Sequence, residues 1–142
     1  MITIRRLGLE DYTAMCEVWK DSGVHYQPSG RESYASFARQ MASGLQTAIG
    51  ACADGQLVGV ALATHDGRKG WINRLGVRPA FQRQGIGRML VEEVERILHE
   101  QGMTIVAALV EKWNDASLSL FQSEGYKIMD AYYLTKRDTP DA

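Results

Sequence analysis

The stretch from Leu75 to Leu90 constrains the fold more than any other part of the chain. An apolar run ends at Pro79, a short turn follows, and Gly85 and Gly87 open a long amphipathic segment. This order is typical of a strand that leads through a turn into a helix. The first N–H groups of a helix are unpaired, and the helix dipole favours negative charge there. The stretch therefore predicts an anion site, although helix starts of this kind also form without a ligand.

The composition limits the classes of protein that the chain can belong to. Its 142 residues suffice for one domain with a sizeable core, and we expect that domain over residues 1–137 with a frayed tail over 138–142. A net charge of −1 gives no bulk attraction to nucleic acid or to an anionic membrane. No apolar run approaches the roughly 20 residues of a membrane span, and no signal peptide is recognisable. We expect a cytoplasmic protein without nucleic-acid or membrane partners.

The two cysteines give no sign of metal or disulfide chemistry. Cys16 and Cys52 stand alone on predicted secondary structure, without the spacing of metal ligands. We expect both to be reduced residues of the core, and we predict no metal site.

Hydrophobic periodicity predicts about seven strands and four helices. The strands are expected at 3–6, 47–52, 57–64, 71–77, 104–110, 126–129 and 132–136, and the helices at 10–20, 31–43, 85–101 and 116–123. The continuous apolar run over 104–110 is typical of a central strand buried on both faces. The crossover from 71–77 through a helix to 104–110 is expected to be parallel and right-handed. The predicted fold is α/β of the α+β type, with a mixed central sheet and helices on both faces.

Two motifs in this order resemble those of the GNAT superfamily of N-acetyltransferases. Residues 82–87, with the sequence Gln-Arg-Gln-Gly-Ile-Gly, fit the family's R/Q-x-x-G-x-G/A pyrophosphate motif. A second family pattern, N-x-x-A/S-x-x-L-aromatic-x-x-x-G-aromatic, is matched at Asn114, Ser117, Leu120, Phe121, Gly125 and Tyr126. The spacing fits a dinucleotide-binding or Walker motif less well, because neither the further glycine spacing nor a lysine follows Gly87.

The resemblance implies an acyl-CoA-dependent N-acetyltransferase. Acetyl-CoA would be the co-substrate, and the acceptor would be a primary amine of a small molecule or peptide. The implied cofactor contacts are Leu75, Gly76, Val77, Arg83, Gln84, Gly85, Ile86, Gly87, Arg88 and Asn114. The family's sheet splays between its fourth and fifth strands, with a bulge expected at Gly76 and an oxyanion donor at the N–H of Val77. Dimers are common in the family, so the resemblance also admits a homodimer.

The resemblance leaves the catalytic acid and base open. Phe121, expected in the core, stands where many members carry a tyrosine, and it has no proton to donate. The strand over 71–77 holds no carboxylate. Glu111, just beyond the fifth strand, and His25, in the loop after the first helix, are the two candidate bases.

Aromatic residues near the predicted acceptor site are also ambiguous. Tyr26 and Trp71 are candidates for the acceptor pocket, and Trp113 is a third, although packing roles fit both tryptophans. Because no acid or base is assigned, a non-catalytic acyl-CoA-binding or regulatory module is an alternative to the enzyme.

Overall fold

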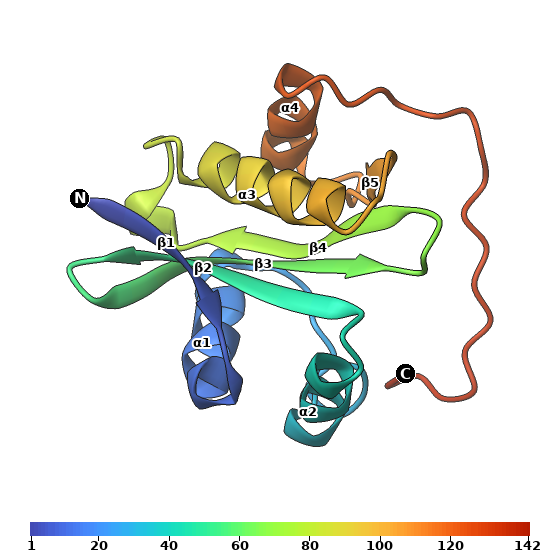
Figure 1. The fold of residues 1–142 in the computed structure, drawn as a ribbon, viewed down its shortest axis with the longest axis horizontal. Helices are drawn as coiled ribbons and strands as arrows, with labels where there is room; N and C mark the ends of the chain where they lie inside the picture. Colours follow the sequence, from blue (N-terminus) through green and yellow to red (C-terminus); the bar gives the residue numbers. More distant parts are fainter.

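The computed structural model describes residues 1–142 and contains a mixed sheet between two layers of helices (Figure 1). The strands, in their order across the sheet, are β1 (Ile2–Leu7), β2 (Gln46–Ala53), β3 (Gln56–His65), β4 (Gly70–Val77) and β5 (Val106–Ala108). The helices are α1 (Tyr12–Ser22), α2 (Tyr34–Ala42), α3 (Ile86–Glu100) and α4 (Asp115–Ser123), with 3₁₀ turns at Leu9–Asp11 and Pro79–Phe81. The predicted α/β class and mixed sheet are confirmed.

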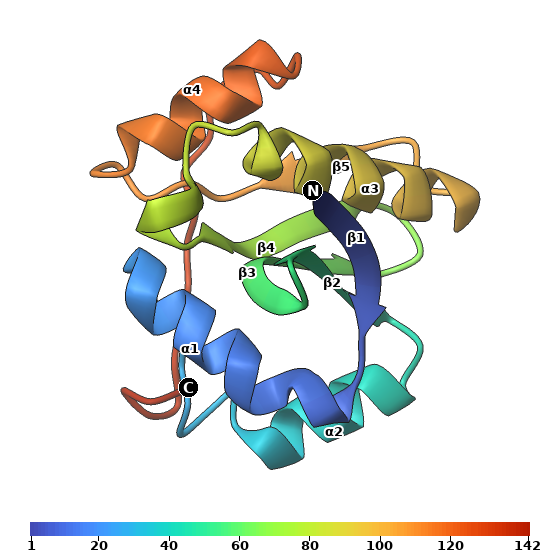
Figure 2. The ribbon, with the colours of Figure 1, turned by 90° about the vertical axis from the view of Figure 1, so that its left-hand side faces the viewer.

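The helices cover the sheet on both faces (Figure 2). α1 and α2 lie on one face, and α3 and α4 lie on the other. α3 is helical because six apolar residues recur at helical spacing and are buried: Ile86, Leu90, Val91, Val94, Ile97 and Leu98. The centre of the sheet is β3, where every residue from Leu57 to Ala63 is buried. Cys52 is buried and Cys16 half-buried, and both are free thiols.

The C-terminal part of the chain departs from the predicted sheet, which has five strands and not about seven. Residues 126–129 and 132–136 form no strands, because the chain leaves α4 and runs away from the sheet (Figure 1). The strand expected at 104–110 is reduced to Val106–Ala108. It is the edge strand and not a central one, so its neighbours Ile105 and Leu109 are more than half exposed.

The sheet opens between β4 and β5. The two strands run parallel, and β5 pairs only with Gly70–Ile72, the first three residues of β4. Further along, β4 is bulged: its register against β3 slips between Asn73 and Gly76, and Arg74 has a φ of 54°. The bulge therefore lies at Arg74 and not at Gly76, which pairs in register with Val60. The extra residue bends β4 where it leaves β5.

The junction of β1 and α1 contains a buttressed carboxylate. Asp11 accepts hydrogen bonds from the Gly8 N–H (2.9 Å) and from the Arg5 guanidinium (2.8 and 3.1 Å). The hydrogen bond from Arg5 holds the pKa of Asp11 below its ordinary value. Asp11 therefore stabilises the fold above its unfolded pKa of about 3.9, and the contribution is lost as the pH falls through the lower, folded pKa.

We predict that Asp11→Asn lowers the free energy of unfolding at pH 7 by about 1 kcal/mol, because the charge-assisted bonds are lost. The difference from the parent chain should shrink below pH ~4. Urea denaturation at both pH values measures it. If the difference in unfolding free energy stays the same at both pH values, the charge of Asp11 does not stabilise the fold.

Candidate functional site

A cavity of about 660 Å³ lies where β4 and β5 separate. Its walls come mainly from β4, the loop after α1, the segment after β5 and the C-terminal residues, with single residues of α2 and β2 and pairs from β3 and α4. Leu75, His25, Glu111 and Asn114 are among the lining residues. The fold thus gathers cofactor and base candidates from segments far apart in the sequence.

The turn before α3 has the backbone geometry of an anion site. Arg83 and Gly85 have φ values of 64° and 80°, so two left-handed residues precede the helix. The Met89 N–H donates to the Gly85 carbonyl (3.1 Å), so the N–H groups before it lack a partner one turn back in the helix. A side chain at position 85 would meet no atom within 4 Å. An anion could therefore approach this turn freely.

The other residues of the α3 motif divide between the surface and the core. Arg83 and Gln84 are exposed, whereas the Ile86 side chain is buried, so only its backbone is free to bind a ligand. Arg88 pairs with Glu124 at 3.1 Å.

Gly87 has a packing role in the contact between α3 and α4. A Cβ there would stand 2.9 Å from Leu120 Cδ2. The contact is between two helices, and it explains this glycine without a ligand.

The edge of β4 that faces the opening carries a free donor. The Arg78 N–H donates to the Val58 carbonyl on β3 (2.8 Å). Because antiparallel strands alternate the direction of their backbone groups, the N–H and carbonyl of Val77 face away from β3. Its carbonyl accepts a hydrogen bond from Gln82 Nε2 (3.0 Å), which leaves the N–H pointing to the open side.

Neighbouring positions on β4 are more restricted. Gly76 lies against the end of α1, because a Cβ there would stand 2.6 Å from Ser22 Oγ.

The candidate bases both line the cavity, and Asn114 has a structural role beside them. His25 contacts Gln27 Nε2 through its Nε2 at 3.0 Å, and Glu111 is exposed. Asn114 caps α4, since its Oδ1 accepts the Ser117 N–H at 3.1 Å. The cap uses the oxygen of this amide and leaves its NH₂ group without a partner within the chain.

The three aromatic candidates differ in whether they line the cavity. Tyr26 packs on Trp19, with ring centroids 5.4 Å apart, and Trp71 lies under the Lys69 ammonium at 4.6 Å. Neither Tyr26 nor Trp71 lines the cavity, whereas Trp113 does and is largely exposed. The packing roles considered for the tryptophans thus suit Trp71 better than Trp113.

The position of the family tyrosine is apolar. Phe121 is buried and meets Tyr126 edge-on, with ring centroids 5.0 Å apart. The Tyr126 hydroxyl donates to Glu95 (2.7 Å). Burial of the side chain raises the pKa of Tyr126, and the hydrogen bond to the Glu95 carboxylate raises it further. Tyr126 does not line the cavity, and its hydroxyl is engaged with Glu95, so it does not replace the family tyrosine there.

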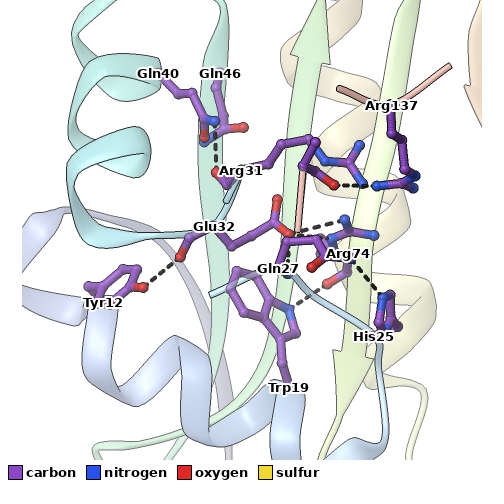
Figure 3. A network of polar contacts seen from close by, with 11 residues as sticks. Tyr12, Trp19, His25, Gln27, Arg31, Glu32, Gln40, Gln46, Arg74 and Arg137 are labelled. Atoms are coloured by element: carbon purple, nitrogen blue, oxygen red, sulfur yellow. Dashed lines mark hydrogen bonds and ion pairs between the residues drawn. The ribbon is translucent and has the colours of Figure 1, made fainter. Parts of the chain in front are cut away.

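An ion pair between Glu32 and Arg74, which no sequence pattern indicated, lines the cavity. Figure 3 shows it within a network of polar contacts. Glu32 is the one charged residue of the chain that is buried. Its Oε1 accepts hydrogen bonds from the Gln27 N–H (2.8 Å) and from Arg74 Nε (3.1 Å), and it lies 3.0 Å from Arg74 Nη2. The Arg74 carbonyl accepts from Trp19 Nε1 (2.8 Å). The loop after α1 is thereby tied to the bulge of β4. No local pattern could reveal a contact between residues 42 positions apart.

We predict that Glu32→Gln lowers the free energy of unfolding by about 2 kcal/mol, because Arg74 loses its partner in a largely desolvated site. Urea denaturation at pH 7 measures this. The matched control is Glu93→Gln, which breaks the surface pair with Arg96 (2.6 Å) and should cost less than about 0.5 kcal/mol. Equal losses of unfolding free energy in the two variants would show that the buried pair contributes no more to stability than the surface pair.

Comparison with known proteins identifies the family. The acetyltransferase (GNAT) family model matches residues 9–126. An acetyltransferase of Pectobacterium atrosepticum is 31% identical over 84 residues, which span 59% of this chain and 60% of that protein.

Solved structures share the fold. The PaiA N-acetyltransferase of Thermoplasma acidophilum, in complex with coenzyme A, has 23% identity and a TM-score of 0.80 over 93% of both chains. An aminoglycoside acetyltransferase from an uncultured soil sample has 20% identity and a TM-score of 0.76, over 95% of this chain and 97% of the other. No helix here has the length and apolar character needed to cross a bilayer. Because the family model covers most of its length, the chain belongs to the GNAT family of acetyltransferases.

Proposed function

We propose that this chain is an acyl-CoA-dependent N-acetyltransferase that moves an acetyl group from acetyl-CoA directly to a primary amine. The observation that carries the proposal is the opening between β4 and β5, which leaves one edge of β4 unpaired beside the cavity. Membership of the GNAT family and the coenzyme A complex of a structural neighbour support it.

The cofactor contacts follow from the chemistry of coenzyme A. Its pyrophosphate suits the N–H groups of residues 86–88, beside the open space at Gly85. Its pantetheine amides suit the free edge of β4 over residues 75–77, as an added strand would. The Asn114 amide lines the cavity together with Leu75 of β4 and is a further candidate contact. The N–H of Val77 is then a donor for the oxyanion that forms when the amine attacks the thioester.

We predict that Gly85→Asn weakens coenzyme A binding at least tenfold, about 1.4 kcal/mol, because a side chain enters the open space above the turn. Asparagine tolerates a positive φ, so the fold should persist. The matched control is Gly55→Asn in the β2–β3 turn, which has the same φ within one degree (81° against 80°) and the same open surroundings.

Isothermal titration with coenzyme A and melting of both variants test this prediction. Both should lose similar stability, and only Gly85→Asn should lose affinity. Unchanged affinity in a folded Gly85→Asn would contradict the pyrophosphate assignment. Stabilisation of the parent chain by nucleoside triphosphates, and not by coenzyme A, would point to a different phosphate ligand.

The proton transfers define the remaining roles. A protonated amine must lose a proton before it can attack, and Glu111 and His25 are the lining groups proposed to accept it. The leaving thiolate needs no dedicated acid, because an ordinary thiol has a pKa of about 8.5. The aminoglycoside acetyltransferase among the structural neighbours supports a small-molecule amine as the acceptor.

We predict that removing the true base lowers kcat/KM by roughly 10²–10⁴ at neutral pH and flattens the acidic limb of the pH–rate profile. Glu111→Gln and His25→Ala each remove one candidate, and we favour Glu111 because it lies close in sequence to Asn114. Thiol release across a panel of amines supplies the assay. If both variants keep the pH–rate profile of the parent chain, neither residue is the base and water accepts the proton.

A non-catalytic acyl-CoA-binding module is the second candidate. It is favoured by the buried Phe121 at the family tyrosine position and by the absence of a carboxylate from β4. Steady turnover of acetyl-CoA with any amine would exclude it. Tight binding of acetyl-CoA without turnover on a broad panel of amines would establish it.

A further inference from the structure

The guanidinium group of Arg74 is held in place but only partly used. Its Nε and Nη2 both lie against one oxygen of Glu32, at 3.1 and 3.0 Å, and its carbonyl accepts a hydrogen bond from Trp19 Nε1 (2.8 Å). Its Nη1 has no partner within the chain. Because every buried side-chain nitrogen and oxygen has a partner, the unpartnered Nη1 is accessible from outside. Arg74 lines the cavity, so this group can donate to a ligand there.

The unused donors of Arg74 have the geometry of a carboxylate site. A guanidinium carries five N–H groups in one plane. Glu32 engages the edge formed by Nε and Nη2, which leaves both hydrogens of Nη1 and one hydrogen of Nη2. These hydrogens lie at the end of the group, where Nη1 and Nη2 can each donate to one oxygen of a carboxylate. Arg74 can therefore bind a second carboxylate without releasing Glu32.

A second guanidinium lines the same cavity without a partner. Arg31 is exposed, and its side chain takes part in no hydrogen bond or ion pair of the chain. Its backbone is fixed to α2, because its carbonyl accepts a hydrogen bond from Gln40 Nε2 at 2.8 Å (Figure 3). Glu32 balances the charge of Arg74, so Arg31 gives this wall a net positive charge. That charge favours an anionic group on the ligand.

The remaining charged residues leave the two sides of the cavity with opposite charges. Glu111, which follows β5, is exposed and carries a negative charge. In the C-terminal segment, the charges of Lys136 and Asp138 offset one another, and Arg137 already donates to the Ala142 carbonyl. The cavity is thus basic beside β4 and the loop after α1, and acidic on the side of β5. A small zwitterion matches this distribution.

We propose that the acceptor is an amine that also carries a carboxylate, as an amino acid does, and that Arg74 and Arg31 bind this carboxylate. The inference rests on the proposed transferase activity and names the class of its acceptor. Arg74 and Val77 are three residues apart on β4, which is roughly 10 Å along a strand. A long arginine side chain and a small acceptor together span that distance. The two arginines thus determine specificity, and neither takes part in the proton transfers.

The first test compares amino acids with the amines that their decarboxylation gives, such as L-lysine with cadaverine and L-phenylalanine with phenethylamine. Thiol release from acetyl-CoA measures turnover, and calorimetric titration into the coenzyme A-loaded protein measures affinity. At least one amino acid should exceed its amine by roughly tenfold or more in kcat/KM or in affinity, because the amine leaves the arginine donors unpaired. A smaller or reversed preference in every pair would overturn the inference.

The failure of this inference is distinguishable from the failure of the proposed function. Turnover of amines without a preference for the carboxylate would overturn the inference and leave the transferase activity intact. Absence of turnover with every compound would contradict the transferase activity. The affinities would then still decide whether the cavity selects a carboxylate, because the titrations need no reaction.

The second test asks whether the two arginines cause the preference. Arg74→Lys keeps a cation beside Glu32, so the fold should persist, but one ammonium cannot reproduce the planar pair of donors. Arg31→Gln removes the charge of an exposed side chain. Each variant should weaken the amino acid roughly tenfold, in KM or in affinity, and change the matched amine less than about twofold.

The matched control is Arg39→Gln, an exposed arginine of α2 that does not line the cavity, and it should keep the preference of the parent chain. Thermal melting establishes that each variant is folded. A folded Arg74→Lys with the full preference would overturn the assignment. If Arg74→Lys does not fold, Arg31→Gln decides, and an undiminished preference in that variant would overturn it.

Discussion

The separation of β4 from β5 after three paired residues is the constraint on which the site depends. A continuous ladder would occupy the edge of β4 and leave its N–H groups no free direction. The bulge at Arg74 bends the strand at this point, with a left-handed backbone that costs energy for a residue other than glycine. Glu32 and Trp19 hold that conformation through the side chain and the carbonyl of Arg74. The loop beside the cavity is thereby fixed to the strand that forms its floor.

Two stretches of unpaired backbone lie in this part of the fold. One is the edge of β4 beyond its pairing with β5, and the turn before α3 adds N–H groups beside the open space at Gly85. The other is the outer edge of β5, which is apolar and faces solvent. Backbone groups of both stretches need partners.

Much of the fold could be predicted from the sequence because helices and hairpins are encoded locally. The apolar spacing from Ile86 to Leu98 predicted α3. The apolar runs at 47–52, 57–64 and 71–77 predicted β2, β3 and β4 to within one residue at each end. Apolar runs also predicted strands at 126–129 and 132–136, and these predictions are wrong. Such a run shows that a segment suits a sheet, but it does not show that a neighbouring strand is available.

The sequence by itself determined the element order through α4, the glycine turn before α3 and the family motifs, since all are patterns over a few consecutive residues. Tertiary structure alone decided that β5 is an edge strand, that the bulge lies at Arg74, and that Glu32 pairs with it. It also decided that Gly87 packs on Leu120 and that His25 and Glu111 share one cavity. The physical reason is that pairing, close approach and burial depend on residues distant in sequence, which local periodicity cannot record.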